Sequence, residues 1–309
     1  MIVRESFRRD AARLVIWYPV RWFIRFMPVR TAFAFFRCLG DLQRWLGKKS
    51  LHGLKKNIHR ALPDHPQPSA VLKRYLRNHY VDRLHIFTYP RLRNPGVLET
   101  ICRIAGLENL HQALAAGRGA IIVLGHYGPI QLPLFHLGLS GYSIVQVGLP
   151  TDEGLSWIGR HVAFRLRLRY EAMIPARILP ADRFLRPLFH QLAENGIVMM
   201  NIDPAGGGRW IGPMIRRPFF GHEIPFPLGS ALLSAKSGAP IVPLSITLDA
   251  LDRAVCTLHP PLPPVERGRE ADSIATLAAW YEDRVRRDPG LWHFWDEYEP
   301  GKLLAGSGE

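Results

Sequence analysis

The chain has 309 residues, of which 47% are hydrophobic and 21% are charged, so it can fold around a large core. Its 40 Lys and Arg residues outnumber its 26 Asp and Glu residues and give a formal net charge of +14, which favours an anionic partner. The three cysteines, Cys38, Cys102 and Cys256, form no CxxC pair, which argues against a metal cluster or a disulfide framework.

The first 50 residues form an apolar and aromatic segment that arginines interrupt. Its uncharged runs fall short of the roughly 18–20 residues needed to cross a bilayer, and no small-residue cleavage site marks a secretory signal. Aromatic residues recur at helical spacing, and Pro19 and Pro28 should break or kink the segment. We predict two or three short helices in a membrane interface, with arginines reaching lipid phosphates. The alternative is that these faces pack on the protein's own core.

Residues 51–309 are predicted to form a second unit, an α/β domain. Residues 51–95 should be two polar helices separated by the DHPQP break, and strands then alternate with helices. This alternation is typical of a mixed sheet flanked by helices. The predicted strands lie within 101–110, 120–125, 142–150, 196–203 and 239–248; the predicted helices cover 111–119, 129–141, 155–190, 230–238 and 273–289, with a long loop over 204–229.

A histidine follows the most apolar of these strands. The strand AIIVLG (120–125) is followed directly by His126, and Gly128 lets the backbone approach a ligand closely. Ligands of α/β proteins gather beyond the carboxyl ends of strands, and imidazole titrates near neutral pH. His126 is therefore a candidate catalytic base, although a lone histidine at such a place can also be structural.

The stretch LGHYGPIQ (124–131) resembles the first motif of the lysophospholipid acyltransferase superfamily, in which His is followed after four residues by Asp or Glu. Within that superfamily the chain looks most like the bacterial late acyltransferases of lipid A synthesis and the mycobacterial mannoside acyltransferases. Further family-like blocks follow in the family's order, and the resemblance covers roughly residues 15–300. They are LKKNIHRALPD (54–64), DRFLRPLFHQLAENGIVMMNID (182–203) and RRPFFGHEIPFPLGSALLSAKSGAPIVPLSI (216–246).

The resemblance implies a lysophospholipid-acyltransferase-like fold that moves a fatty acyl group from acyl carrier protein or acyl-CoA to a hydroxyl or amine of a lipid or lipid-like acceptor. His126 would act as general base, and no metal or bound cofactor is implied. The protein would lie on the cytoplasmic face of a bacterial inner membrane, as a peripheral or monotopic protein. Both donors are acidic and suit the positive chain. Nucleic-acid binding is not expected, because no recognised module appears.

Gln131 stands where the family has an acidic residue. Its carbonyl oxygen can accept a hydrogen bond from imidazole, but it carries no charge to stabilise imidazolium. Three interpretations are open. Another carboxylate can serve, with Asp203 the best candidate and Asp152 and Glu153 weaker ones; or the acceptor is an easily activated group such as an amine; or the protein is a non-catalytic relative that only binds lipid or acyl carrier.

Arginines are the candidate phosphate ligands, because guanidinium groups match phosphate oxygens. Arg183 matches the arginine that precedes the family's glycine–strand–Asp block, and Arg160 lies in the same arginine-rich stretch. The run GGGRW (206–210) lacks the Gly-Lys-Ser/Thr ending of a phosphate-binding P-loop. We interpret it as a loop that shapes the substrate site, with Arg209 near the entrance.

The segment PFFG (218–221) offers apolar rings for an acyl chain. We predict that Phe219 and Phe220 line the acyl site beside Gly221, and the alternative is that Gly221 forms a plain turn.

Overall fold

A computed structural model of the chain describes residues 6–47, 51–148, 152–180, 186–204 and 212–305. Its α-helices are α1 (Phe7–Val15), α2 (Arg21–Phe26), α3 (Val29–Leu46), α4 (His52–Ala61), α5 (Pro68–Leu84), α6 (Tyr89–Leu92), α7 (Pro95–Glu99), α8 (Leu107–Leu114), α9 (Leu132–Leu139), α10 (Arg165–Glu171), α11 (Arg186–Ala193), α12 (Gly229–Ser237) and α13 (Glu270–Arg287). Helical turns of other pitch are η1 (Ile16–Val20), η2 (His85–Thr88), η3 (Gly159–Phe164) and η4 (Pro289–Leu291).

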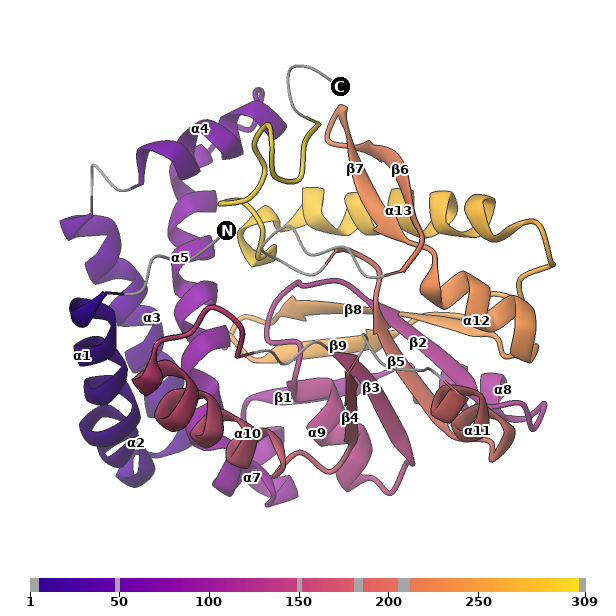
Figure 1. The fold of residues 1–309 in the computed structure, drawn as a ribbon, viewed down its shortest axis with the longest axis horizontal. Coiled ribbons are helices and arrows are strands. Elements are labelled where there is room, and N and C mark those ends of the chain that lie inside the picture. Colours follow the sequence, from indigo (N-terminus) through magenta and orange to yellow (C-terminus); the bar gives the residue numbers. More distant parts are fainter. Residues whose placement is uncertain (1–5, 48–50, 149–151, 181–185, 205–211, 306–309) are drawn as a thin grey trace.

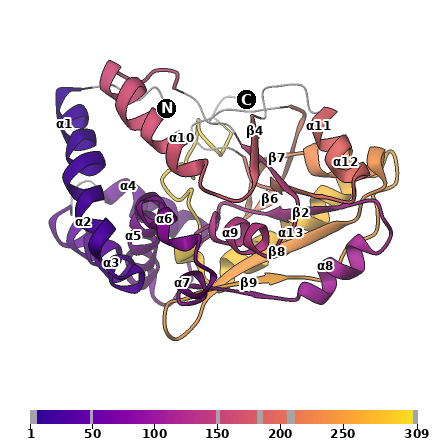
Figure 2. The same cartoon turned by 90° about the horizontal axis from the view of Figure 1, so that it is seen from below.

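Seven strands form one mixed sheet in the order β1–β9–β8–β2–β5–β3–β4. They are β1 (Cys102–Ala105), β2 (Ala120–Leu124), β3 (Ile144–Gly148), β4 (Arg177–Pro180), β5 (Ile197–Asn201), β8 (Ile241–Leu248) and β9 (Ala254–Leu258). The pairs from β8 to β4 are parallel, and β8 pairs with β9 antiparallel. Helices lie on both sides of the sheet, while α1–α5 gather at one end of it (Figures 1 and 2). The predicted mixed sheet flanked by helices is confirmed.

The structure corrects the prediction in three places. The loop predicted over 204–229 is wrong where β6 (Met214–Phe219) and β7 (His222–Pro227) form an antiparallel hairpin. Proline interrupts both strands in the sequence, and a two-stranded hairpin tolerates proline because its outer edges need no partner. The uniform helix predicted over 155–190 is wrong at β4, which is a four-residue edge strand. β9 was not predicted, because its alternation spans only five residues.

The N-terminal segment is helical, as predicted, but Pro19 does not break it. α1, η1 and α2 continue into one another with helical backbone angles, and Pro19 lies in the five-residue π-helical stretch η1. Such a wider turn accommodates a residue without an N–H group. The helix stops at Met27, before Pro28.

Helix α3 shows two faces. Phe33 and Phe36 are buried and pack in the core, where α3 lies against α5, while the large side chains Trp45 and Leu46 are exposed.

In the part of the chain that the structure describes, no helix combines the length and the apolar character needed to span a membrane. The predicted boundary between residues 1–50 and 51–309 stays a prediction.

Candidate active site

His126 and Asp203 lie two residues beyond the ends of neighbouring parallel strands. Leu124 at the end of β2 pairs with Asn201 at the end of β5. Pairing continues past the strands, because the N–H of Ile202 donates to the carbonyl oxygen of Leu124 at 2.7 Å. Neighbouring strands lie about 4.8 Å apart, so equal steps along both chains bring the two side chains together at the carboxyl edge of the sheet.

The Asp203 carboxylate is buried and receives hydrogen bonds from several donors. Oδ1 accepts from Nδ1 of His126 at 2.7 Å, and the backbone N–H of His126 lies 3.0 and 2.9 Å from the two oxygens. Oδ2 also accepts from the hydroxyl of Tyr281 at 2.8 Å and from the indole N–H of Trp292 at 3.4 Å. A buried carboxylate needs such donors, and an ionised one can only accept.

The hydrogen bonds assign the tautomer of His126. Because Nδ1–H donates to Asp203, Nε2 of the neutral ring carries the free lone pair. The side-chain nitrogen of Asn201 donates to Nε2 at 3.1 Å, and among the described residues Oδ1 of Asn201 has no hydrogen-bond partner. The His126 side chain is 21% exposed, so the ring is not fully enclosed.

Burial and charge act on His126 in opposite directions. Burial by itself lowers the pKa of the imidazole, because it disfavours the charged form. The negative charge of Asp203 and its hydrogen bond to the ring act the other way, with smaller contributions from Asp82 and Glu297. The result is that the pKa of His126 is raised above its usual value of 6.5.

This pKa shift predicts a pH-dependent stability. The folded-state pKa of His126 lies above the unfolded value near 6.5, so the pair with Asp203 adds stability that is complete below about pH 6 and is lost as pH rises through the raised pKa. Urea unfolding of wild type and His126→Gln should therefore differ more at about pH 5.5 than at about pH 8.5. An equal difference at both pH values would contradict the assignment.

Two glycines allow this arrangement. A Cβ atom on Gly125 would lie 2.1 Å from the ring of Tyr281, so glycine lets the tyrosine reach Asp203. Gly128 has a φ of +68°, which side chains rarely adopt. The sequence thus keeps the turn between β2 and α9 free of side chains at the places where other elements approach.

A C-terminal strap, residues 288–295, holds this turn from the other side. The N–H of His293 donates to the carbonyl oxygen of His126 at 3.0 Å, and its ring Nε2 lies 2.8 Å from the carbonyl oxygen of Gly128. The ring of Phe294 lies 4.8 Å, centroid to centroid, from that of His126. His126 is therefore held at two places. The strap binds the backbone carbonyl of His126, and Asp203 binds its imidazole ring.

In the described structure, the hydrogen-bond partners of the His126 ring nitrogens are Asp203 and Asn201, not Gln131. The backbone of Gln131 begins α9, and its side-chain Oε1 is buried without a hydrogen-bond partner among the described residues. Asp203 occupies the position at Nδ1 that the sequence left open between several carboxylates. Asp152 instead pairs with Arg160 at 3.1 Å, and Glu153 is exposed.

Of the three arginines predicted to bind substrate, the structure describes one. Arg160 is half exposed on η3 in its ion pair with Asp152. Arg183 and Arg209 lie outside the described residues, and their roles stay predictions.

The Phe219–Phe220 pair has a core position. Both rings are buried, and they pack on Trp292 with centroid distances of 5.2 and 6.3 Å. Gly221, with a φ of +75°, forms the turn of the β6–β7 hairpin, which agrees with the plain-turn alternative. Contact of these rings with an acyl chain stays a prediction that this packing does not support.

Sequence reasoning missed the residues that complete the site: Asn201, Tyr281, Trp292 and His293. A signal existed for Asn201, since an amide at the end of an otherwise apolar strand stands out two residues before Asp203. Tyr281 and Trp292 lie 78 and 89 residues from Asp203, and only the fold brings them to it.

In the described ranges, no cluster of three or more His, Cys, Asp or Glu side chains is suited to hold a metal ion.

Comparison with known proteins identifies what the chain is similar to. Residues 7–296 match the family described as bacterial lipid A biosynthesis acyltransferase. The chain is 24% identical over 249 residues to the phosphatidylinositol mannoside acyltransferase of Mycobacterium tuberculosis strain H37Rv, covering 78% of this chain and 74% of that protein. The protein of the same name from strain CDC 1551 gives the same identity and coverage.

Proposed function

The chain belongs to the bacterial lipid A biosynthesis acyltransferase family and is a lipid acyltransferase, and we propose that it moves a fatty acyl group from a thioester of acyl carrier protein or coenzyme A to a hydroxyl or amine of a lipid-like acceptor. The observation that carries this proposal is the 2.7 Å hydrogen bond between Nδ1 of His126 and Asp203. It leaves Nε2 of the neutral ring able to accept a proton.

In the proposed reaction, the acceptor's O–H or N–H takes the place of Asn201 at Nε2 of His126. The acceptor atom gives its proton to Nε2 and bonds to the thioester carbonyl carbon, which forms a tetrahedral oxyanion. The oxyanion collapses, the C–S bond breaks, and the imidazolium returns the proton to the leaving thiolate. Asp203 stabilises the imidazolium through the Nδ1–H bond, so it supplies the charge that Gln131 lacks.

The test is acyl transfer by the purified protein in detergent, with labelled acyl carrier protein or acyl-CoA and a total bacterial lipid extract. We expect His126→Ala to lower transfer by about 10²–10⁴-fold, since that is the usual contribution of general acid–base catalysis. His190→Ala, which removes an exposed histidine on α11, is the matched control and should leave transfer unchanged.

The two outcomes separate the proposal from its alternative. Transfer that survives in His126→Ala would refute the role of His126. A wild-type protein that binds acyl carrier or lipid but transfers nothing with either donor would favour the non-catalytic interpretation.

We also propose that the protein lies on an anionic membrane, at the cytoplasmic face of a bacterial inner membrane. Large apolar side chains are exposed along α1, α2 and α3, among them Trp22 at 65% and Phe26 at 68%. Arg25 stands between these two residues, and Arg21 directly precedes Trp22. Exposed aromatic residues interleaved with arginine are the pattern of a helix that inserts shallowly among lipid head groups.

We expect Trp22→Asp with Phe26→Asp to weaken binding to phosphatidylglycerol vesicles at least about tenfold, because each buried aromatic side chain contributes on the order of 1 kcal/mol or more. Co-sedimentation with vesicles measures this. Phe189→Asp, on α11 at the far side of the molecule from α2 (Figure 1), is the control. If the control weakens binding as much as the double change, this face is not the docking surface.

A further inference from the structure

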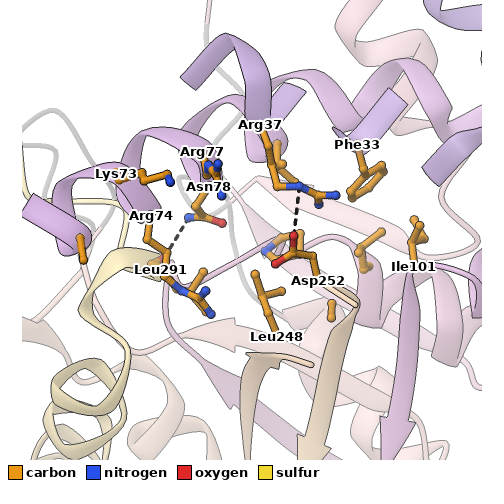
Figure 3. A pocket seen from close by; sticks show the side chains of 15 residues that line it. Phe33, Arg37, Lys73, Arg74, Arg77, Asn78, Ile101, Leu248, Asp252 and Leu291 are labelled. Carbon is orange, nitrogen blue, oxygen red and sulfur yellow. Dashed lines mark hydrogen bonds and ion pairs between the residues drawn. The ribbon is translucent and has the colours of Figure 1, made fainter. Parts of the chain in front are cut away.

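A pocket of about 240 Å³ lies beside α3 and α5 (Figure 3). Because the end of β8 lines it, the pocket is at the same edge of the sheet as His126, on the side of β2 away from β5. The strand order explains its position, because β8 and β9 lie on one side of β2 and β5 lies on the other. Leu248 at the end of β8 and Ala254 at the start of β9 form part of its wall. Helices α3 and α5 and the start of α9 close the remaining sides.

The pocket combines an apolar floor with a basic rim. Figure 3 shows Lys73, Arg77 and Arg37 along the helical side, with Leu248 and Asp252 facing them. The apolar lining includes Phe33, Val81, Ile101, Leu132, Leu248 and Leu291. A cavity of this kind fits a ligand with one charged end and one hydrocarbon end.

Lys73 and Arg74 lie four and three positions before Arg77, so each can approach Arg77 on the side of α5 that lines the pocket. The two arginines are held in place by carboxylates. Nε of Arg74 donates to Asp288 at 2.8 Å, and Nε of Arg77 donates to Asp41 at 2.9 Å.

Donors remain on this face for an anion. In the described part of the chain, Nη1 of Arg74, Nη1 of Arg77 and the ammonium of Lys73 make no hydrogen bond. Arg37 is compensated by Asp252 at 3.4 Å. The four cations therefore face three carboxylates. Lys73 forms no ion pair in the described structure, although, after the hydrogen bond from Arg77, its charge also helps to lower the pKa of Asp41.

We propose that this pocket binds a single-chain amphiphile with an anionic head group. The head lies on Lys73, Arg74 and Arg77, whose unused donors match the oxygens of a phosphate or carboxylate. The chain lies over the apolar floor. The pocket is smaller than a typical site for a whole small-molecule ligand, so it holds the head and the first part of the chain. The proposal does not depend on the transfer mechanism.

The pocket is linked to the turn that carries His126. The side-chain nitrogen of Asn78, on the pocket wall, donates to the carbonyl oxygen of Leu291 at 3.0 Å, and the N–H of Gly128 donates to the same oxygen at 2.9 Å. Pro129 also lines the pocket. A bound amphiphile therefore contacts the segments that fix the His126 turn and should raise the melting temperature of the protein.

The experiment is calorimetric titration of the full chain with dodecyl phosphate below its critical micelle concentration. Inorganic phosphate supplies the head without the chain, and dodecyltrimethylammonium supplies the chain with the opposite charge. We expect one dodecyl phosphate to bind per chain, with weaker or no binding of the two comparison compounds. Lys73→Glu, which breaks no ion pair of the described structure, should weaken binding at least about tenfold.

The matched control is Lys236→Glu, which makes the same charge change at an exposed position on α12. Equal weakening by Lys236→Glu, or equal binding of dodecyltrimethylammonium, would overturn the proposal, because binding would then be general charge attraction or detergent adsorption. If inorganic phosphate bound as tightly as dodecyl phosphate, the hydrocarbon chain would contribute nothing to binding. The proposal of an amphiphile site would then be refuted, and the pocket would be a site for free phosphate. Laurate in place of dodecyl phosphate distinguishes a carboxylate head from a phosphate head.

Discussion

Replacing Asp203 with asparagine is expected to lower acyl transfer by about 10⁴-fold, the loss seen when the orienting aspartate of a serine protease becomes asparagine. In this chain Asp203 accepts from both the ring and the backbone N–H of His126. An asparagine has one acceptor oxygen and carries no charge, so it cannot hold this tautomer and also stabilise imidazolium. The measurement is single-turnover transfer from a labelled thioester.

The pH dependence gives a second measure of the same change. The charge of Asp203 raises the pKa of His126, so its removal should shift the acid limb of the rate profile to lower pH. The matched control is Gln131→Ala, which alters the residue at the family's acidic position and should change transfer only a few-fold. A loss in Gln131→Ala as large as that in Asp203→Asn would mean that the glutamine, not Asp203, supports the base.

Replacing Trp295 with alanine is expected to lower the free energy of unfolding by about 3–5 kcal/mol, the usual loss for truncating a buried aromatic side chain. Trp295 is 0% exposed, and its ring lies 4.7 Å from that of Trp292 and 5.5 Å from that of Phe220, centroid to centroid. Its indole N–H donates to Pro289 at 2.6 Å, and its carbonyl oxygen accepts from Asn57 at 2.9 Å. The substitution removes the ring with which the end of the strap packs on Trp292 and Phe220.

Equilibrium unfolding in urea measures this loss. Trp157→Ala is the control, because Trp157 is 71% exposed and a surface change of this kind usually alters stability by less than about 0.5 kcal/mol. If Trp295→Ala costs no more than Trp157→Ala, the packing of the Trp295 ring does not hold the strap.

The part of the site that the sequence predicts is the part that depends on strand ends. β2 and β5 are continuous apolar runs, and such runs mark strands buried on both faces. Once both are placed as neighbours in one parallel sheet, His126 and Asp203 lie close together at its carboxyl edge. The sequence could therefore suggest Asp203 as the partner of His126, but it could not decide between Asp203 and the other candidate carboxylates.

The rest depends on contacts between distant segments. Nothing near Tyr281 or Trp292 in the sequence marks them as partners of a carboxylate, because their role arises from how α13 and the strap pack on the sheet. The prolines in β6 and β7 hid this hairpin from sequence analysis. Proline has a low strand propensity, and the sequence does not show that these strands have free outer edges on which proline is tolerated. An apolar ring suits both a protein core and a site for an acyl chain, so the sequence alone could not assign the role of Phe219 and Phe220. Their packing in the structure identifies them as core residues.

The hydrogen bonds from Tyr281 and Trp292 to Asp203 set an order of assembly during synthesis. Sheet strands β2 and β5 leave the ribosome well before α13 and the strap, so the carboxylate exists before two of its donors do. Until residue 292 has emerged, closing the sheet around Asp203 would bury a charge with part of its partners missing. Domains generally form as units once their long-range contacts are available. The hydrogen-bonded site around His126 is thus complete only when nearly the whole chain has been synthesised.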